Sequence, residues 1–274
     1  GPKQTTVAAA DLRVTQVGSN ARIDVVSGPQ TGKDVTLLNV SQLQLATTNV
    51  TFADHSQLLF GDNSTAQNDN LANTLGGGAG RNLLQGFGGA DTMSSGPGND
   101  TYIVGTGDVV SDVGGIDTIV TDINWTLGTA FENVQMIGTG NISATGNNLD
   151  NFAIGNAGSN YFNMRAGNDT IQAGAGNDWI DMSDFGTGFY GDDVIDGGAG
   201  TDTVNFDISA GQRSGITVDL GAGMIRGGGF DGIGSASVTG IERVIGAGFN
   251  DSMKGSSGAE TLEGRAGNDT LSGG

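Results

Sequence analysis

Single apolar residues recur every nine positions over long parts of the chain, with polar residues on either side. In RAGNDTIQAGAGNDWID, residues 165–181, Ile171 and Ile180 hold the same place after two copies of Gly-Asn-Asp. One apolar residue between polar neighbours predicts a very short strand whose middle side chain points inward. The glycines before each acid predict a tight turn, because glycine reaches backbone angles that other residues avoid. The pattern therefore predicts an all-β chain in which short strands alternate with glycine turns.

The nonapeptide is rich in glycine at positions one to four, acidic or amide at position six and apolar at position eight. The units fall into three runs: 64–72 and 77–103, separated by four residues; 146–181 and 188–205, separated by an insertion at 182–187; and 246–272. Position six holds Asp69, Asn82, Asp91, Asp100, Asn151, Asn160, Asp169, Asp178, Asp193, Asp202, Asp251, Glu260 and Asp269. Position eight holds Leu71, Leu84, Met93, Tyr102, Ala153, Phe162, Ile171, Ile180, Ile195, Val204, Met253, Leu262 and Leu271. Two chemically different positions kept in register predict a solenoid, with two units to each turn and equivalent residues 18 positions apart stacked on one another.

Segments without the nonapeptide separate these runs and carry alternating, β-branched patches. Flexible linkers do not have this density of Val, Ile and Phe. We therefore expect either wider turns of the same solenoid or small sheets packed on it. The predicted organisation is a non-repeat β region at 1–63, starting with a Gly1-Pro2 remnant of protease cleavage; a first run at 64–103; a spacer at 104–145; a second run at 146–205; a spacer at 206–245; and a third run at 246–274, which we expect to be cut short.

The composition indicates that the turns bind a metal ion. The chain of 274 residues has a formal net charge of -19, 51 glycines and no cysteine, and only four of its 30 acidic residues are glutamates. Aspartate holds its carboxylate close to the backbone, where hard cations are bound. A stacked column of aspartates repels itself unless a divalent cation lies between the turns. Calcium tolerates irregular geometry better than magnesium and is the predicted ion.

The best units are GGAGTDTVN at 197–205, AGAGNDWID at 173–181 and GRAGNDTLS at 264–272. They resemble the RTX, or hemolysin-type calcium-binding, repeat GGxGxDxUx. This resemblance implies a parallel β-roll, several Ca²⁺ ions and a secreted or surface-attached bacterial protein exported by type I secretion. We expect the chain to be a fragment of such a protein.

The resemblance also implies the ligands. Each ion would lie between units two apart and take both position-six side chains, with carbonyls from positions two and four of the earlier unit and one and three of the later. The implied sets are Asp178 and Asp202 with Gly174, Gly176, Gly197 and Ala199; Asp169 and Asp193 with Arg165, Gly167, Gly188 and Tyr190; Asp251 and Asp269 with Ala247, Phe249, Gly264 and Ala266; and Asn82 and Asp100 with Gly78, Gly80, Ser95 and Pro97. Asp69 would pair with Asp91 if residues 73–76 loop out, and the second run keeps its register if 182–187 loop out. The position-six asparagines, including Asn151 and Asn160, would be neutral and weaker ligands.

No catalytic motif accompanies the repeats. His55 is the sole histidine, GxSxG is absent, and the paired aspartates follow the metal period. Trp179, at an outward position, could stack a sugar ring, although covering strand edges is the commoner role. The acidic balance argues against nucleic acid as a partner. No apolar run reaches the length that spans a bilayer.

Two functions from different classes remain open. The first is a non-enzymatic structural or adhesive module of an extracellular protein such as an adhesin or S-layer protein, with other domains, the cell surface or polysaccharide as possible partners. The second is the repeat tail of a secreted enzyme (a protease, lipase, or polysaccharide lyase or epimerase) whose catalytic domain lies elsewhere. Sequence flanking this chain would discriminate between them.

Overall fold

The computed structural model describes residues 12–17, 20–25, 34–37, 50–51, 57–60, 71–182, 190–206, 214–228 and 234–274. The chain divides into two compact units, Gly1–Val120 and Thr121–Gly274. All regular structure in the described ranges is β-strand. None of those ranges forms a helix that could cross a membrane. The predicted all-β class is confirmed.

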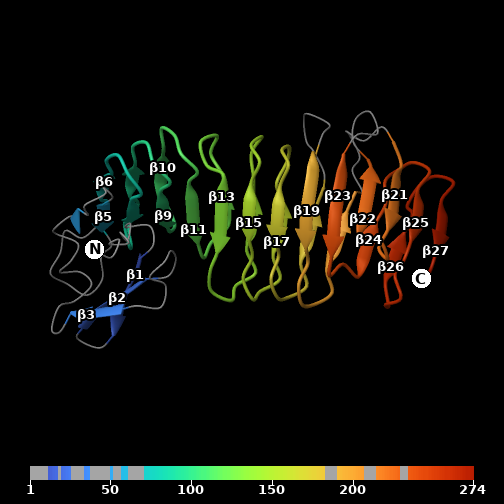
Figure 1. Cartoon of the computed structure of the whole chain (residues 1–274), viewed down its shortest axis with the longest axis horizontal. Coiled ribbons are helices and arrows are strands. Elements are labelled where there is room, and N and C mark those ends of the chain that lie inside the picture. Colours follow the sequence, from blue (N-terminus) through green and yellow to red (C-terminus); the bar gives the residue numbers. More distant parts are fainter. Residues whose placement is uncertain are drawn as a thin grey trace, which may run out of the picture. The chain divides into compact units, whose positions relative to one another are not determined.

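The first unit contains strands β1 to β11, several of which are labelled in Figure 1. Their bounds are β1 Leu12–Val17, β2 Asn20–Val25, β3 Asp34–Leu37, β4 Val50–Thr51, β5 Gln57–Phe60, β6 Thr74–Gly76, β7 Leu83–Gln85, β8 Thr92–Ser94, β9 Thr101–Val104, β10 Val109–Ser111 and β11 Thr118–Thr121, the last ending at the first residue of the second unit. Strands β1, β2 and β3 form an antiparallel sheet. The later strands form parallel pairs that skip one strand each time, β5 with β7, β7 with β9, β6 with β8 and β8 with β10. This alternation is the signature of a coil that closes every two strands.

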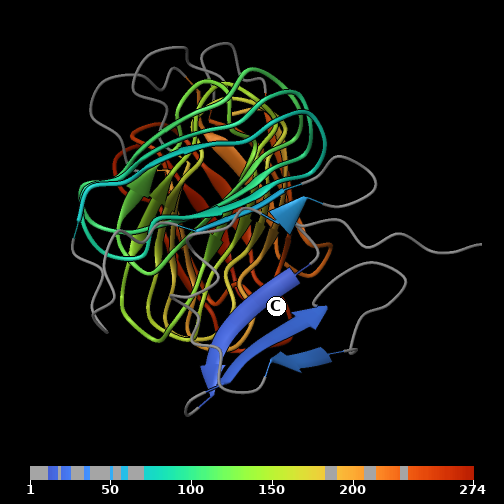
Figure 2. The ribbon, with the colours of Figure 1, turned by 90° about the vertical axis from the view of Figure 1, so that its left-hand side faces the viewer.

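The second unit continues the same principle over a longer stretch. Its strands are β12 Trp125–Thr126, β13 Asn133–Met136, β14 Ser143–Thr145, β15 Phe152–Ile154, β16 Tyr161–Asn163, β17 Thr170–Gln172, β18 Trp179–Asp181, β19 Asp192–Asp196, β20 Thr203–Asn205, β21 Ile216–Asp219, β22 Met224–Gly227, β23 Ser235–Thr239, β24 Arg243–Ile245, β25 Ser252–Lys254, β26 Thr261–Glu263 and β27 Thr270–Ser272. One face stacks β13, β15, β17 and β19 in parallel, and the other stacks β14, β16, β18, β20, β24 and β26. Figure 2 looks along the stack, so that successive coils of this unit overlie one another. The predicted parallel β-roll is confirmed.

Position eight supplies the core of the roll. Met93, Phe162 and Ile195 are fully buried, and Phe162 lies in register with Ile180 on the neighbouring strand. The side chains at positions seven and nine of a three-residue strand point the other way, because successive side chains alternate across a strand. Each coil therefore buries one apolar side chain per strand, and a coil is stable only when neighbours cover it. Leu271, in the final strand β27, is 47% exposed.

The structure corrects the register of the first run. Residues 73–76 do not loop out, because Thr74–Gly76 is strand β6 and Leu75 pairs with Met93. Leu75 is 8% exposed, whereas Leu71, predicted to point inward, is 49% exposed. The unit before Gly77 is therefore 68–76. This unit has no glycine at positions one to four, so the sequence pattern did not identify it.

The spacers are part of the roll in the described residues. Residues 109–111 and 118–121 form β10 and β11, which stack on nonapeptide strands. The spacer after β20 adds an antiparallel excursion, in which β22 lies between β21 and β23. Strand β23 is parallel to β19, and β21 is parallel to β25. Three strands thus occupy the place of one coil on this face.

Candidate metal sites

The position-six side chains form columns along the coils. The backbone N–H of Asn82 donates to Asp100 Oδ1 at 2.6 Å, and the N–H of Asn160 donates to Asp178 Oδ1 at 2.7 Å. The same bond joins Asn151 to Asp169 at 2.7 Å and Asp251 to Asp269 at 2.9 Å. All four pairs are 18 residues apart, as the two-unit coil predicts.

The insertion in the second run leaves this register intact. The N–H of Asp169 donates to Asp193 Oδ1 and the N–H of Asp178 donates to Asp202 Oδ1, both at 2.8 Å and both across 24 residues. Ile180 accordingly pairs with Val204 between β18 and β20. The aspartates expected to form pairs in this run are therefore adjacent. Of the insertion, residues 183–187 lie outside the described residues, as do the predicted ligands Asp69 and Gly188 and the sole histidine, His55.

The second carboxylate oxygen of these aspartates has no such donor. Oδ2 of Asp100, Asp169, Asp178 and Asp202 is buried and accepts no hydrogen bond. A buried carboxylate oxygen without a partner is costly, because it has lost its water and gained nothing in return. A cation at these oxygens would remove that cost.

Burial raises the pKa values of these aspartates. It is the main cause that raises the pKa of Asp178 to about 6, that of Asp169 to about 7 and that of Asp193 to about 8. Neighbouring carboxylates add to the effect, Asp202 on Asp178 and Asp169 on Asp193. Without a cation, the folded chain therefore favours a proton on groups that are ordinarily ionised at neutral pH.

The hydrogen bonds of Asn82 show which groups surround the atom that corresponds to Oδ2 of a position-six aspartate. Its amide oxygen accepts from the N–H of Gln57, and its Nδ2 donates to Gly78 O at 2.8 Å, Gly80 O at 3.0 Å and Ser95 Oγ at 2.9 Å. An aspartate here would instead aim Oδ2 at two carbonyl oxygens, which cannot donate, and at the Ser95 hydroxyl. The carbonyls of the turn thus converge on the position-six side chain, and an amide N–H or a cation satisfies them. Calcium, which takes carbonyl and carboxylate oxygens, fits the aspartate coils.

The other two asparagines at position six make hydrogen bonds of the same kind. Nδ2 of Asn151 donates to Glu132 O at 3.1 Å, and Nδ2 of Asn160 donates to Asn156 Oδ1 at 3.0 Å. Their amide oxygens accept backbone N–H groups. Each of the three asparagines thus uses Nδ2 as a donor and its amide oxygen as an acceptor within the protein. Their role as neutral calcium ligands stays a prediction.

The predicted carbonyl ligands lie at the turns between the columns. Gly174 O accepts from the N–H of Ala199, Ala199 O from the N–H of Gly176, and Pro97 O from the N–H of Gly80. The carbonyls of Gly167, Gly176 and Phe249 face the glycine at position four of the next coil, where a Cβ would come within 1.7 Å, 1.6 Å and 2.4 Å of them. Arg165 has φ of +71°, which places position two in the left-handed region. Of the rest, Gly197, Tyr190 and Ala247 are buried, Gly264 is buried against Asp269, and Ala266 is exposed. Coordination by these carbonyls stays a prediction.

Sequence reasoning missed further members of the columns. Asn73 donates its N–H to Asp91 Oδ1 at 2.7 Å and so holds the place that we expected for Asp69. Asp108 accepts from the N–H of Asp91 at 2.9 Å, and Asp117 accepts from the N–H of Asp100 at 2.8 Å. The latter pairs are 17 residues apart, because one unit of this coil has eight residues. The run Gly115-Ile116-Asp117-Thr118-Ile119 matches positions four to eight and would have revealed Asp117 had a shortened unit been allowed.

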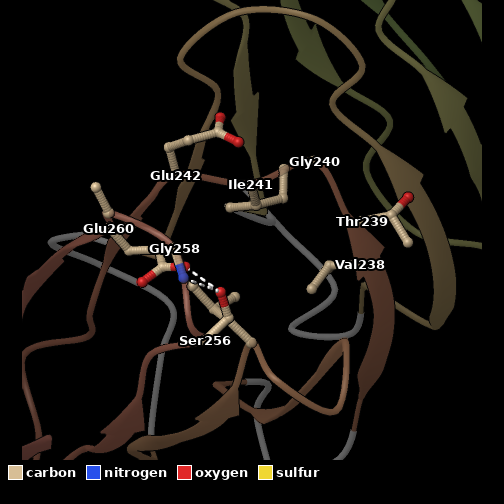
Figure 3. Close-up of a pocket in the computed structure, with 10 residues that line it drawn as sticks. Val238, Thr239, Gly240, Ile241, Glu242, Ser256, Gly258 and Glu260 are labelled. Carbon is tan, nitrogen blue, oxygen red and sulfur yellow. Dashed lines mark hydrogen bonds between the residues drawn. The ribbon is translucent and has the colours of Figure 1, made fainter. Parts of the chain in front are cut away.

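Glutamate takes position six at one more place. Glu242 Oε2 accepts from the N–H of Asp202 at 2.9 Å, across 40 residues. Figure 3 shows Glu242 and Glu260 among the residues lining a cavity of about 240 Å³. The Ser256 hydroxyl donates to Glu260, and the N–H of Gly258 donates to Ser256 Oγ at 3.0 Å. Each of these longer side chains thus has one carboxylate oxygen hydrogen-bonded to the protein.

Comparison with known protein families matches four segments, residues 68–102, 145–180, 183–208 and 238–274, to the RTX calcium-binding nonapeptide repeat. The first match begins at 68, in agreement with the corrected register. No curated protein matches the sequence. The repeats, the two-unit coils and the buried carboxylate columns agree, and repeats of this kind bind Ca²⁺ at several sites. The chain therefore carries four copies of the RTX calcium-binding nonapeptide repeat, folded as a β-roll.

Proposed function

We propose that this β-roll is the calcium-responsive module of a larger extracellular or cell-surface protein, which folds when it meets calcium after secretion and then gives structural or adhesive support. The observation that carries the proposal is the set of buried, unpartnered Oδ2 atoms at Asp100, Asp169, Asp178 and Asp202. They make the native fold unfavourable wherever the ion is scarce and favourable wherever it is abundant.

The magnitudes support such a switch. Neighbouring coils stand about 4.8 Å apart. Two carboxylates at roughly 5 Å repel by about 3 kcal/mol at an effective dielectric near 20. A bound ion contributes about 2.7 kcal/mol per site at a hundredfold excess over its Kd. Several sites together are therefore comparable with the roughly 5–15 kcal/mol by which native proteins are usually stable.

Export supplies the reason for a switch. The formal net charge of -19 expands an unfolded chain. Turn sites made of carbonyls and two carboxylates belong with the weak extracellular calcium modules, with Kd of about 10⁻⁴–10⁻³ M. A cytosol poor in free calcium would leave the chain extended and fit for a secretion channel, whereas the exterior would fold it.

We assign the ions to the aspartate pairs whose members touch through the N–H to Oδ1 bond, Asp169 with Asp193, Asp178 with Asp202 and Asp251 with Asp269. The last pair differs, because Oδ2 of Asp251 already accepts from the N–H of Ala247 at 2.9 Å. We therefore expect the first two pairs to bind more strongly than the third.

The test is a calcium titration of chelator-treated protein, followed by far-ultraviolet circular dichroism. We expect little β signal in chelator and a sigmoidal gain with a midpoint well above micromolar, because each filled coil supplies half of the next site. Magnesium at the same concentrations is the matched control and should restore much less signal, since it demands stricter octahedral geometry. An unchanged spectrum in chelator, or a hyperbolic curve that saturates below a micromolar, would contradict the proposal.

A further inference from the structure

A coil that lies outside the four matched segments repeats the geometry of the nonapeptide. Asp117 Oδ1 accepts from the N–H of Asp100 at 2.8 Å, as position six does elsewhere. A Cβ on Gly115 would come within 1.5 Å of Gly98 O, so Gly115 stacks on the coil before it as a position-four glycine does. The match to the first repeat segment ends at residue 102. Residues 112–117 therefore form position one to position six of a unit that the repeat pattern does not include.

Position one is where a side chain meets position six. A Cβ at Gly86 would lie 2.0 Å from Asp91 Oδ2, and one at Gly264 would lie 2.4 Å from Asp269 Oδ2. At Ser95 the hydroxyl already contacts the position-six amide of the neighbouring coil. A longer polar side chain at position one would therefore lie beside the position-six carboxylate, where we expect the calcium ion.

In the unmatched coil, position one is Asp112. Carboxylate oxygens of Asp100, Asp112 and Asp117 lie within 4.8 Å of one another, and Asp100 and Asp117 are buried. The N–H of Gly114 donates to Asp112 Oδ1 and the Tyr102 hydroxyl donates to Asp112 Oδ2, both at 2.7 Å. These two bonds fix the third carboxylate in place against the other two.

One of the three carboxylates in this cluster has an unpartnered oxygen. Asp100 is 1% exposed, and its Oδ2 accepts no hydrogen bond. Its Oδ1 accepts from the N–H of Asn82, just as the amide oxygen of Asn82 accepts from the coil before it. Oδ2 of Asp100 therefore corresponds to Nδ2 of Asn82, the atom that contacts two turn carbonyls and the position-one side chain.

We propose that Asp100, Asp112 and Asp117 together bind one divalent cation, preferentially calcium, in a site with three carboxylates where the repeat sites have two. Calcium sites are tuned by the number of charged ligands. The third carboxylate makes this the tightest of the sites proposed for the chain, filled at calcium concentrations that leave the two-carboxylate sites empty. Being tightest, it orders its coil first and gives the neighbouring nonapeptides a surface on which to stack.

The experiment compares Asp112→Asn with Asp122→Asn by calcium calorimetry on the full chain. Asparagine keeps the shape of residue 112 and removes one charge, whereas Asp122 is exposed and provides the control for a lost charge. We expect the highest-affinity phase to weaken about tenfold or more in Asp112→Asn and to stay unchanged in Asp122→Asn. Identical isotherms for Asp112→Asn and the parent chain would overturn the site. A chain that binds no calcium at all would instead overturn the proposed function.

A second measurement guards against a folding defect at residue 112. Tyr102 donates to the proposed ligand, so its ring should sensitise terbium bound among the three carboxylates. Terbium added in amounts that fill only the tightest site should emit on tyrosine excitation, and Tyr102→Phe should lose most of that emission while calorimetry still finds the ion. Full emission from Tyr102→Phe would place the tightest site elsewhere. A cluster neutralised by a shared proton would give neither emission nor a high-affinity phase, which would also overturn the proposal.

Discussion

Removing either carboxylate of the Asp178 and Asp202 pair should remove the same ion. The N–H of Asp178 donates to Asp202 Oδ1, and Oδ2 of both residues is buried without a hydrogen bond. Asparagine can keep the Oδ1 bond and turn Nδ2 toward the turn carbonyls, as Asn82 does. Both Asp178→Asn and Asp202→Asn should therefore fold in calcium.

The magnitude follows from linkage. The folded state gains about 1.4 kcal/mol for each tenfold rise in free calcium and each ion bound. At a hundredfold excess over Kd, each single variant should lose about 2.7 kcal/mol of unfolding free energy, and so should the double variant. Independent sites would give about 5.4 kcal/mol for the double variant, so the coupling energy to be measured is about 2.7 kcal/mol.

The assay is urea unfolding at a series of free calcium concentrations. The slope of unfolding free energy against the logarithm of calcium counts the ions released. We expect both single variants and the double variant to have the same slope, one ion below the parent chain. Asp122→Asn, which changes an exposed carboxylate, should keep the parent slope. A double variant that has lost two ions would refute the shared site and the register across the insertion.

Three further outcomes follow from the same geometry. Asn82→Asp replaces a satisfied amide with a carboxylate, so calorimetry should find one additional calcium ion and circular dichroism should find a chain less stable in chelator. Gly176→Ala should lower the unfolding free energy by about 2 kcal/mol or more, because φ is +123° and the new Cβ would lie 2.5 Å from a carbonyl oxygen. In Gly248→Ala the new Cβ meets nothing within 4 Å, so thermal denaturation should find this control nearly as stable as the parent chain. In chelator, protonation of Asp169 and Asp193 favours folding; this stabilisation is complete below the unfolded pKa of 3.8 and is lost as the pH rises through about 7 and about 8. Protons compete with calcium for the same carboxylates, so the calcium midpoint should rise as the pH falls through that window.

The period itself was enough to predict the roll. Apolar residues such as Ile171 recur every nine positions, and two units make one coil. Ile171 therefore pairs with Ala153, the equivalent residue one coil earlier. The pairing of Asp178 with Asp202 across an insertion also follows from the sequence, since the units on either side keep their own register.

Three features did not follow, each for a physical reason. The unit at 68–76 lacks its turn glycines, so only contacts with β8 reveal that Leu75 faces inward. Asp117 stands 17 residues after Asp100, and a search for a fixed period of nine passes over it. The direction of the Asn82 amide depends on acceptors from two coils at once, which no single stretch of sequence specifies.

The coil at 146–163 is the one place in the second unit where both position-six residues are asparagine. Bonds between coils run along the stacking direction, so tension applied in that direction is carried by successive coils in series. Coils loaded in series separate first at the weakest junction. The coil at 146–163 is joined to the preceding coil through amide hydrogen bonds, such as that from Asn151 Nδ2 to Glu132 O. In saturating calcium, extension under load would therefore start at this coil, and the aspartate coils beyond it would keep their ions.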